Sequence, residues 1–183
     1  MNLALQRYSS GAVTLHWIMA VLVIGQILLV WAGDLAGDNA RMFRDAHKAN
    51  GMMLLVLTLV RIGWRLSHRV PPLPEGTPGW QAFAARATQG LFYVLLLVMP
   101  LTGWIASSAA GRDIGFHGLF NWPLLPIGGG RETAGMVMDV HRAGAKLLYA
   151  LLVLHVGGAL HHHLIRRDDV LRSMLPASRR RQG

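Results

Sequence analysis

The chain has 183 residues, of which 52% are hydrophobic and 15% charged, and its mean hydropathy of +0.36 is that of a membrane protein. It contains no cysteine, which excludes disulfides, iron–sulfur clusters, thiolate zinc sites and covalent attachment of haem through cysteine. No basic patch with interleaved aromatic residues accompanies the net charge of +9, so we assign that charge to the loops and expect no nucleic-acid partner.

The first apolar segment covers about residues 12–33 and would be ~33 Å long as a helix, enough to cross a bilayer. The hydrophobic part of a secretory signal is shorter, about 7 to 15 residues, so a cleaved signal is the weaker interpretation. His16 lies one turn inside the start of this segment, and Trp17 beside it is an aromatic residue typical of the membrane interface.

The second apolar segment covers about residues 47–66 and begins with His47. Arg61 lies 14 residues further along. This offset is about 21 Å on a helix, so Arg61 is expected near the opposite membrane face from His47. A charge at that depth needs a partner, which makes Arg61 a candidate for the site.

A proline-rich link leads to the third apolar segment, about residues 87–108, which Pro100 and Gly103 interrupt. Membrane spans tolerate such residues where neighbouring helices restore the backbone hydrogen bonding. The longest loop follows, residues 109–138, and is rich in glycine. We expect this loop to lie on the membrane surface as a cap.

The fourth apolar segment, about residues 139–165, carries His141 and His155 14 residues apart. That spacing is about 21 Å along a helix and about 40° short of four full turns, so the two histidines share one face. An ionisable side chain inside a span is costly unless something coordinates it or pairs with it. Two at this spacing indicate two metal centres, one near each leaflet.

Together these segments predict an all-α fold, an integral membrane four-helix bundle that forms one domain over residues 1–183. Eleven of the 18 Lys and Arg residues lie on the side of the termini, so the positive-inside rule predicts that both termini are cytoplasmic. Antiparallel assembly then pairs His16 with His155 toward the cytoplasmic leaflet and His47 with His141 toward the outer leaflet. Two facing imidazoles are what a six-coordinate haem iron requires. The alternative is that these are interfacial histidines bonded to lipid or backbone.

The same features resemble the bacterial cytochrome b561 family. The matching motifs are Leu15-His16-Trp17, the histidine that starts the second span, Pro71-Pro72 after an arginine-rich exit, the His-x13-His of the fourth span with a histidine cluster behind it, and Leu175-Pro176 before a basic tail. The resemblance covers essentially the whole chain. It implies two b-type haems whose iron is ligated by His16, His47, His141 and His155, in a multi-pass protein of the bacterial inner membrane. It also implies electron exchange between the ubiquinone pool and an outer-side one-electron donor, with superoxide oxidation proposed.

Other candidate residues lie close to these pairs. His162, in the triple histidine 161–163, is about 20° off the face of His155, so with Trp17 it could contact a quinone headgroup at the cytoplasmic haem. A quinone site at the outer leaflet is an equal alternative, and the cluster could also be merely interfacial. His68 and His117 are expected in solvated loops.

Cations are expected around both pairs. Arg61 would support the cytoplasmic haem. Four more surround the outer pair, where they would bind propionates, attract a small anionic donor such as superoxide, or simply flank the spans: Arg44, Lys48, Arg142 and Lys146.

Two other functions remain open at this stage. The chain could be the haem-bearing membrane anchor subunit of a respiratory dehydrogenase or hydrogenase, or a small cation transporter that uses histidine sites. No soluble catalytic domain is evident, so an oxidoreductase of the superoxide/quinone type would act at its haem edges. The partners expected are membrane lipid, ubiquinone, an anionic one-electron donor, and either a dehydrogenase or a second copy of the chain.

Overall fold

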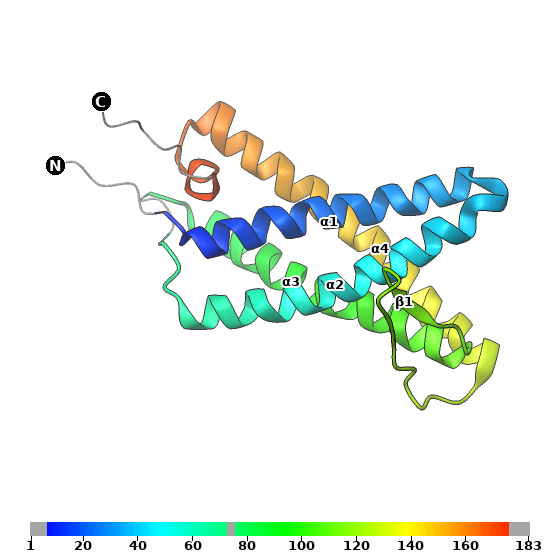
Figure 1. Cartoon of the computed structure of the whole chain (residues 1–183). Coiled ribbons are helices and arrows are strands. Elements are labelled where there is room, and N and C mark those ends of the chain that lie inside the picture. Colours follow the sequence, from blue (N-terminus) through cyan, green and yellow to red (C-terminus); the bar gives the residue numbers. More distant parts are fainter. Residues whose placement is uncertain (1–6, 73–75, 176–183) are drawn as a thin grey trace, which may run out of the picture.

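The computed structural model describes residues 7–72 and 76–175, and four long helices dominate it. They are α1 (Ser10–Leu35), α2 (Ala40–Ser67), α3 (Gly79–Ala109) and α4 (Gly130–His161). All four are long and apolar enough to cross a membrane, which confirms the predicted four-helix membrane bundle. The described chain starts and ends at one end of the bundle, here called the terminal end, and the turn between α1 and α2 lies at the other, the distal end (Figure 1).

The helices begin earlier than the hydropathy predicts. The second predicted span starts at residue 47 and the fourth at residue 139, whereas α2 starts at Ala40 and α4 at Gly130. The additional turns carry charged residues, such as Arg41 and Glu132, that suit a helix projecting beyond the hydrocarbon layer. Hydropathy marks only the part of a helix that lies inside that layer, so it underestimates the length of the helix.

Local sequence explains where the helices start and turn. The hydroxyl of Ser9 accepts a hydrogen bond from the amide of Ala12 and so caps α1. A short 3-10 helix, η1 (Gly37–Asn39), then joins α1 to α2, and Gly37 adopts the left-handed φ of 53° that this tight turn requires. The connection is short, so α1 and α2 pack as antiparallel neighbours.

The predicted loop 109–138 contains a small β-hairpin, and its last residues belong to α4. Strands β1 (Ile114–Phe116) and β2 (Phe120–Trp122) pair antiparallel, with Ile114 opposite Trp122. Ile114 is almost fully buried and packs with Met52 and Leu55 of α2. The hairpin is therefore attached to the side of α2 rather than lying free.

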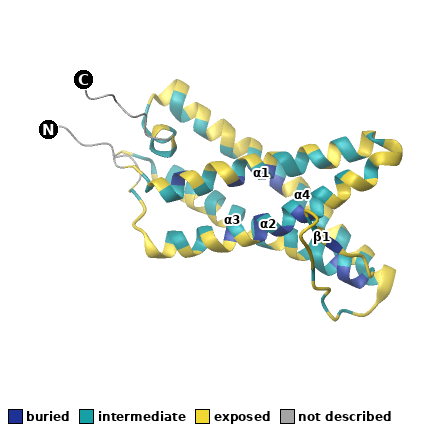
Figure 2. Ribbon diagram, viewed as in Figure 1, coloured by how far each residue is buried: buried dark blue, intermediate teal, exposed yellow. Residues whose placement is uncertain are grey.

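An apolar layer at the middle of the bundle draws on all four helices. Its buried members are Met19, Val23, Leu54, Leu95, Leu148 and Leu151. Elsewhere the helices present mostly exposed or half-buried residues (Figure 2), many of them large and apolar, as expected of a bundle surrounded by lipid. Residues 73–75 of the proline-rich link and the predicted basic tail from Pro176 onward lie outside the described residues.

Candidate functional site

The four span histidines meet as two pairs. His16 of α1 faces His155 of α4, with ring centroids 6.2 Å apart and ring planes at 70°. His47 of α2 faces His141 of α4, also at 6.2 Å, with planes at 76°. We call the first the terminal pair and the second the distal pair. The central apolar layer lies between them, so two separate sites are arranged along the bundle.

Helix α3 orients the ring of His141. Its Nδ1 atom lies 3.0 Å from the carbonyl oxygen of Met99 and 3.0 Å from the hydroxyl of Thr102. A carbonyl only accepts hydrogen bonds, so Nδ1 must carry the proton, and this tautomer leaves the Nε2 lone pair free. The ring packs directly against α3 at Gly103, where a Cβ would lie in ordinary van der Waals contact, 3.7 Å from the ring carbon Cε1.

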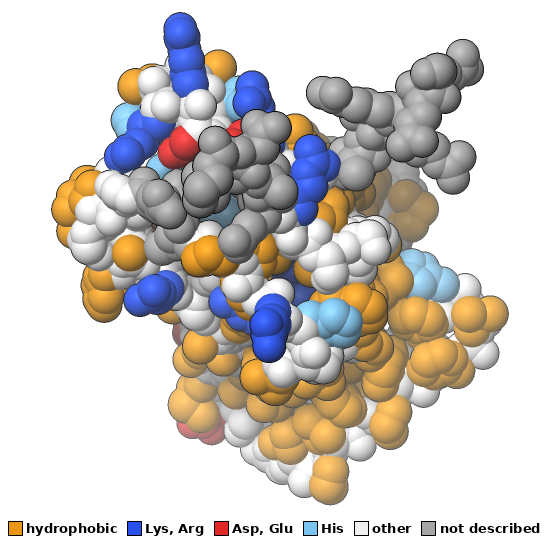
Figure 3. All heavy atoms as spheres, turned by 90° about the vertical axis from the view of Figure 1, so that its left-hand side faces the viewer, with side chains coloured by type: hydrophobic (Ala, Val, Ile, Leu, Met, Phe, Trp, Pro, Cys, Tyr) orange, Lys and Arg blue, Asp and Glu red, His pale blue; other side chains and the backbone are white. Residues whose placement is uncertain are grey.

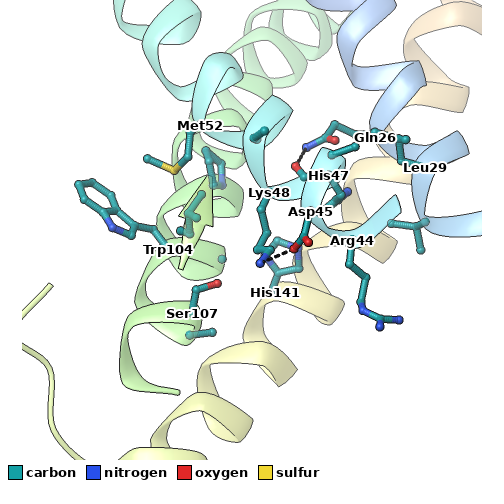
Figure 4. Close-up of a pocket in the computed structure, with 18 of the residues that line it drawn as sticks. Gln26, Leu29, Arg44, Asp45, His47, Lys48, Met52, Trp104, Ser107 and His141 are labelled. Carbon is teal, nitrogen blue, oxygen red and sulfur yellow. Dashed lines mark hydrogen bonds and ion pairs between the residues drawn. The ribbon is translucent and has the colours of Figure 1, made fainter. Parts of the chain in front are cut away.

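Gln26 of α1 forms a hydrogen bond with the backbone of His47, one of the two histidines of the distal pair. Its side-chain Nε2 donates a hydrogen bond to the backbone carbonyl of His47 at 3.0 Å (Figure 4). Gly51 permits this approach, because a Cβ at that position would lie only 3.2 Å from the same nitrogen. Both Gln26 Oε1 and His47 Nδ1 are buried without a hydrogen-bond partner among the described residues.

A cavity of about 1630 Å³ opens beside the distal pair and is lined by both of its histidines. Three of the predicted cations line it as well: Arg44, Lys48 and Arg142. The ammonium of Lys48 pairs with Asp45 at 2.8 Å and donates to the carbonyl of Asp113 at 3.0 Å. Arg142 pairs with Asp139 at 2.8 Å on the exposed surface. These cations are thus partly neutralised at the cavity mouth.

Lys146, the remaining predicted cation, does not line the cavity. It is exposed on α4, five residues after His141. Five residues turn an α-helix by about 500°, which places Lys146 about 140° from the face that carries the histidines. The structure therefore places Lys146 away from the cavity beside the distal pair.

Aromatic residues and one arginine surround the terminal pair. Trp17 lies edge-on to His16 at 5.4 Å, and Phe92 of α3 lies edge-on to His155 at 5.2 Å. The guanidinium of Arg61 donates to the carbonyl of Ala12 at 3.2 Å and is close enough for its charge to act on both histidine rings. The structure thus places Arg61 at the depth that its offset from His47 predicts.

His162 lies at the start of a π-helical turn, η2 (His162–Arg166), and its partner is an acid of this chain. Its Nδ1 lies 2.6 Å from a carboxylate oxygen of Asp168. Burial alone would raise the pKa of Asp168, but hydrogen bonds from His162 and the Val170 amide, with the charges of His162 and Arg166, outweigh it and lower that pKa.

Other candidate residues are also engaged within the chain. The indole of Trp17 donates to the carbonyl of Met174 at 2.7 Å, so the end of the described chain lies against the start of α1. His68 is exposed and stacks on Trp64 at 4.2 Å, and His117 is exposed at the turn of the hairpin. Sequence reasoning missed four contributors to the distal site: Gln26, Gly51, Met99 and Thr102.

A bare metal ion does not suit these pairs. Across residues 7–72 and 76–175, no three His, Cys, Asp or Glu side chains are grouped closely enough to hold an ion. Two imidazoles leave most coordination positions of a metal open, and a prosthetic group that brings its own metal ligands suits such a pair. A four-helix membrane bundle with facing imidazoles in its interior is typical of membrane proteins that bind a metal-containing prosthetic group.

The chain belongs to the prokaryotic cytochrome b561 family, whose model matches residues 7–177. It is therefore a bacterial integral membrane cytochrome, a protein that binds b-type haem and takes part in electron transfer. It is 32% identical to Cytochrome b561 homolog 2 of Escherichia coli (strain K12), over 94% of this chain and 93% of that protein. Cytochrome b562 of Cereibacter sphaeroides is 30% identical over 92% and 94%. A Yersinia pestis protein named "Probable superoxide oxidase CybB" is 25% identical over 95% and 98%.

Proposed function

We propose that this protein carries two non-covalent b haems, one between the histidines of each pair, and passes single electrons between them. The observation that carries the proposal is the 6.2 Å separation of both ring pairs. Two metal–imidazole bonds of about 2 Å, with ring centres about 1.1 Å beyond each nitrogen, require a separation of about 6.3 Å. The spacing of both pairs fits one six-coordinate iron each.

The polar atoms of the distal site also fit an axial ligand. A ligating histidine usually donates its second ring N–H to a carbonyl or carboxylate, which fixes the ring and raises its basicity. His141 makes this contact to Met99. No such partner is described for Nδ1 of His47, so this support comes from His141 alone.

We further propose that the donor is a small one-electron reductant of negative charge, such as superoxide, that arrives at the distal end. Support comes from the cations at the mouth of the distal cavity and from the name of the Yersinia pestis relative. In this proposal the protein lies in the bacterial inner membrane with both termini facing the cytoplasm. Ubiquinone accepts the electrons. A haem supplies the one-electron step that links a radical donor to a two-electron quinone.

For the quinone we propose the terminal end, beside Trp17 and His162. The support is that His162 and Asp168 form a hydrogen-bonded pair that can hold a proton at the terminal end of the bundle. The indole of Trp17 and the ring of His162 are both bonded within the chain. A headgroup would therefore displace or extend these contacts.

Haem quantitation tests the first proposal. The pyridine haemochrome assay should give two haem b per wild-type chain and one in His141→Ala, because only the distal pair is broken. Loss of both haems or of neither in His141→Ala would contradict the assignment of one haem to each pair.

Stopped-flow reduction by superoxide tests the donor site. Lys48→Gln should slow haem reduction, whereas Lys146→Gln is a matched control that should not, because Lys146 lies off the cavity. The wild-type rate should fall as salt rises, since the field is screened within about 8 to 10 Å at physiological ionic strength. Equal rates in both variants would remove the cation rim from the proposal.

Reoxidation of the reduced haems by a soluble ubiquinone analogue tests the quinone site. This reoxidation should be slower in His162→Ala than in the wild type.

A further inference from the structure

Three arginines, at the terminal end of α2 and just beyond it, line a small hollow. Arg61 and Arg65 lie one turn apart on α2, and Arg69 follows two residues after the helix ends at Ser67. The other polar and aromatic side chains of the hollow come from the residues just before α1, from the last turn and end of α2, and from α3: Tyr8, Ser9, Trp64, His68 and Tyr93. Figure 3 looks onto this end of the molecule, where Lys and Arg side chains outnumber acidic ones.

No carboxylate neutralises these arginines. In the part of the chain that the structure describes, none of the three is in a salt bridge. Arg65 donates to the side-chain carbonyl of Gln89 at 3.2 Å and lies 6.0 Å from the ring centre of Tyr93, and Arg61 donates to a backbone carbonyl. These partners are neutral. A guanidinium has five N–H donors, so most of the donors remain available.

The depth of the hollow indicates which anion it takes. Arg65 lies about 6 Å beyond Arg61 toward the terminal end, and Arg69 lies past the end of α2 and is exposed. Tyr8, Trp64 and Tyr93 are aromatic residues of the kind found at the headgroup level of a bilayer. The hollow is distinct from the terminal pair, because neither of its histidines is among the lining residues.

We propose that this arginine hollow binds the phosphate of an anionic phospholipid from the leaflet at the terminal end. Guanidinium groups bind phosphate oxygens in a bidentate manner, and two of them, Arg65 and Arg69, face the headgroup level. The exposed apolar side chains of Leu66 and Val70 offer the adjoining surface on which an acyl chain can lie. This site is separate from the haem and quinone sites proposed above and does not depend on them.

The test uses the purified haem-loaded protein in nanodiscs of phosphatidylcholine containing a small fraction of phosphatidylglycerol. Native mass spectrometry counts the phosphatidylglycerol that stays bound. The double variant Arg65→Gln/Arg69→Gln should weaken this retention at least about tenfold, since each lost charge-assisted bond contributes on that scale. Arg65→Lys keeps the positive charge but cannot bind phosphate in a bidentate manner, so it should retain part of the binding. Arg86→Gln is the matched control, because Arg86 is exposed on α3 at the same end but does not line the hollow.

Several results would overturn the proposal. A wild-type protein that does not prefer phosphatidylglycerol to phosphatidylcholine has no such site, and this measurement stands even if a variant misfolds. An equal loss of phosphatidylglycerol in Arg86→Gln would mean that the lipid is attracted by the positive surface as a whole and not bound in the hollow. Displacement of the lipid by millimolar inorganic phosphate would make free phosphate the ligand. A fall to one haem per chain in the double variant would mean that the hollow holds a haem propionate instead.

Discussion

Replacing Thr102 by valine should change the distal haem and leave the other unaffected. The Thr102 hydroxyl lies 3.0 Å from Nδ1 of His141, where it shares the ring N–H with the Met99 carbonyl. The same hydroxyl donates to the carbonyl of Val98 at 2.8 Å or of Met99 at 2.9 Å. Valine has nearly the same shape, so the substitution removes an acceptor without opening a cavity.

The size of the effect follows from the hydrogen bond that is lost. An acceptor at Nδ1–H makes the imidazole more basic, which favours the oxidised iron, so its loss should raise the reduction potential. A net hydrogen bond of about 0.5 to 1.5 kcal/mol corresponds to about 20 to 65 mV for a one-electron couple. The Met99 carbonyl remains and loses a competing donor, so the shift should fall toward the lower value.

A redox titration that resolves the two haems by their spectra measures this shift. Thr102→Ser is the control, since it keeps the hydroxyl and should leave the potential in place. The reasoning would be refuted by an unchanged potential in Thr102→Val, by an equal shift in both haems, or by the same shift in the serine variant.

Three further perturbations probe other parts of the molecule. Arg61→Leu should lower the potential or the occupancy of the terminal haem alone, because a positive charge beside the haem favours the reduced iron, and an unchanged titration would mean that Arg61 only reaches toward the membrane surface. Gly11→Ala should cost about 1 to 3 kcal/mol in thermal unfolding, because its Cβ would lie 2.2 Å from the ring of Trp64, whereas Gly90→Ala, with no atom within 4 Å, should be tolerated. The lowered pKa of Asp168 adds stability that is complete above the ordinary aspartate pKa of 3.8 and is lost as the pH falls through the lower pKa of the folded state. Asp168→Asn should remove this loss of stability at acid pH, which can be followed as the protease resistance of the C-terminal segment at different pH values. The same dependence on acid pH in the variant and the wild type would contradict this.

The depth of the histidines was predictable because helix geometry is rigid. A 14-residue offset fixes both the rise and the face of His141 and His155 whatever surrounds the helix. The short link between α1 and α2 places His47 close to the entrance of the second span. Pairing by depth then needed only antiparallel packing, and the structure has both pairs at the same separation.

Contacts between helices were not predictable in this way, since they depend on how each helix is rotated and kinked against its neighbour. Pro100 and Gly103 signalled an irregular stretch of α3, but not that the Met99 carbonyl and the Thr102 hydroxyl of this stretch hold His141. Gln26 gave no signal, because one amide in a span is common in helix packing. Lys146 shows the converse, since it is close to His141 in sequence but lies on another side of α4 and does not line the cavity.

If the proposed haems occupy the two pairs, the layer between them would let electrons cross and would stop protons. Its buried side chains are apolar, and the buried Thr58 of α2 turns its hydroxyl to the carbonyl of Leu54 at 2.7 Å. A proton would have to cross this region as a charge without partners, which is strongly unfavourable in a low-dielectric interior. An electron moving between the proposed haems needs no such partners. Proton uptake by a reduced substrate must therefore take place at an end of the bundle, and the terminal end is where the described chain places a histidine and an aspartate in hydrogen-bond contact.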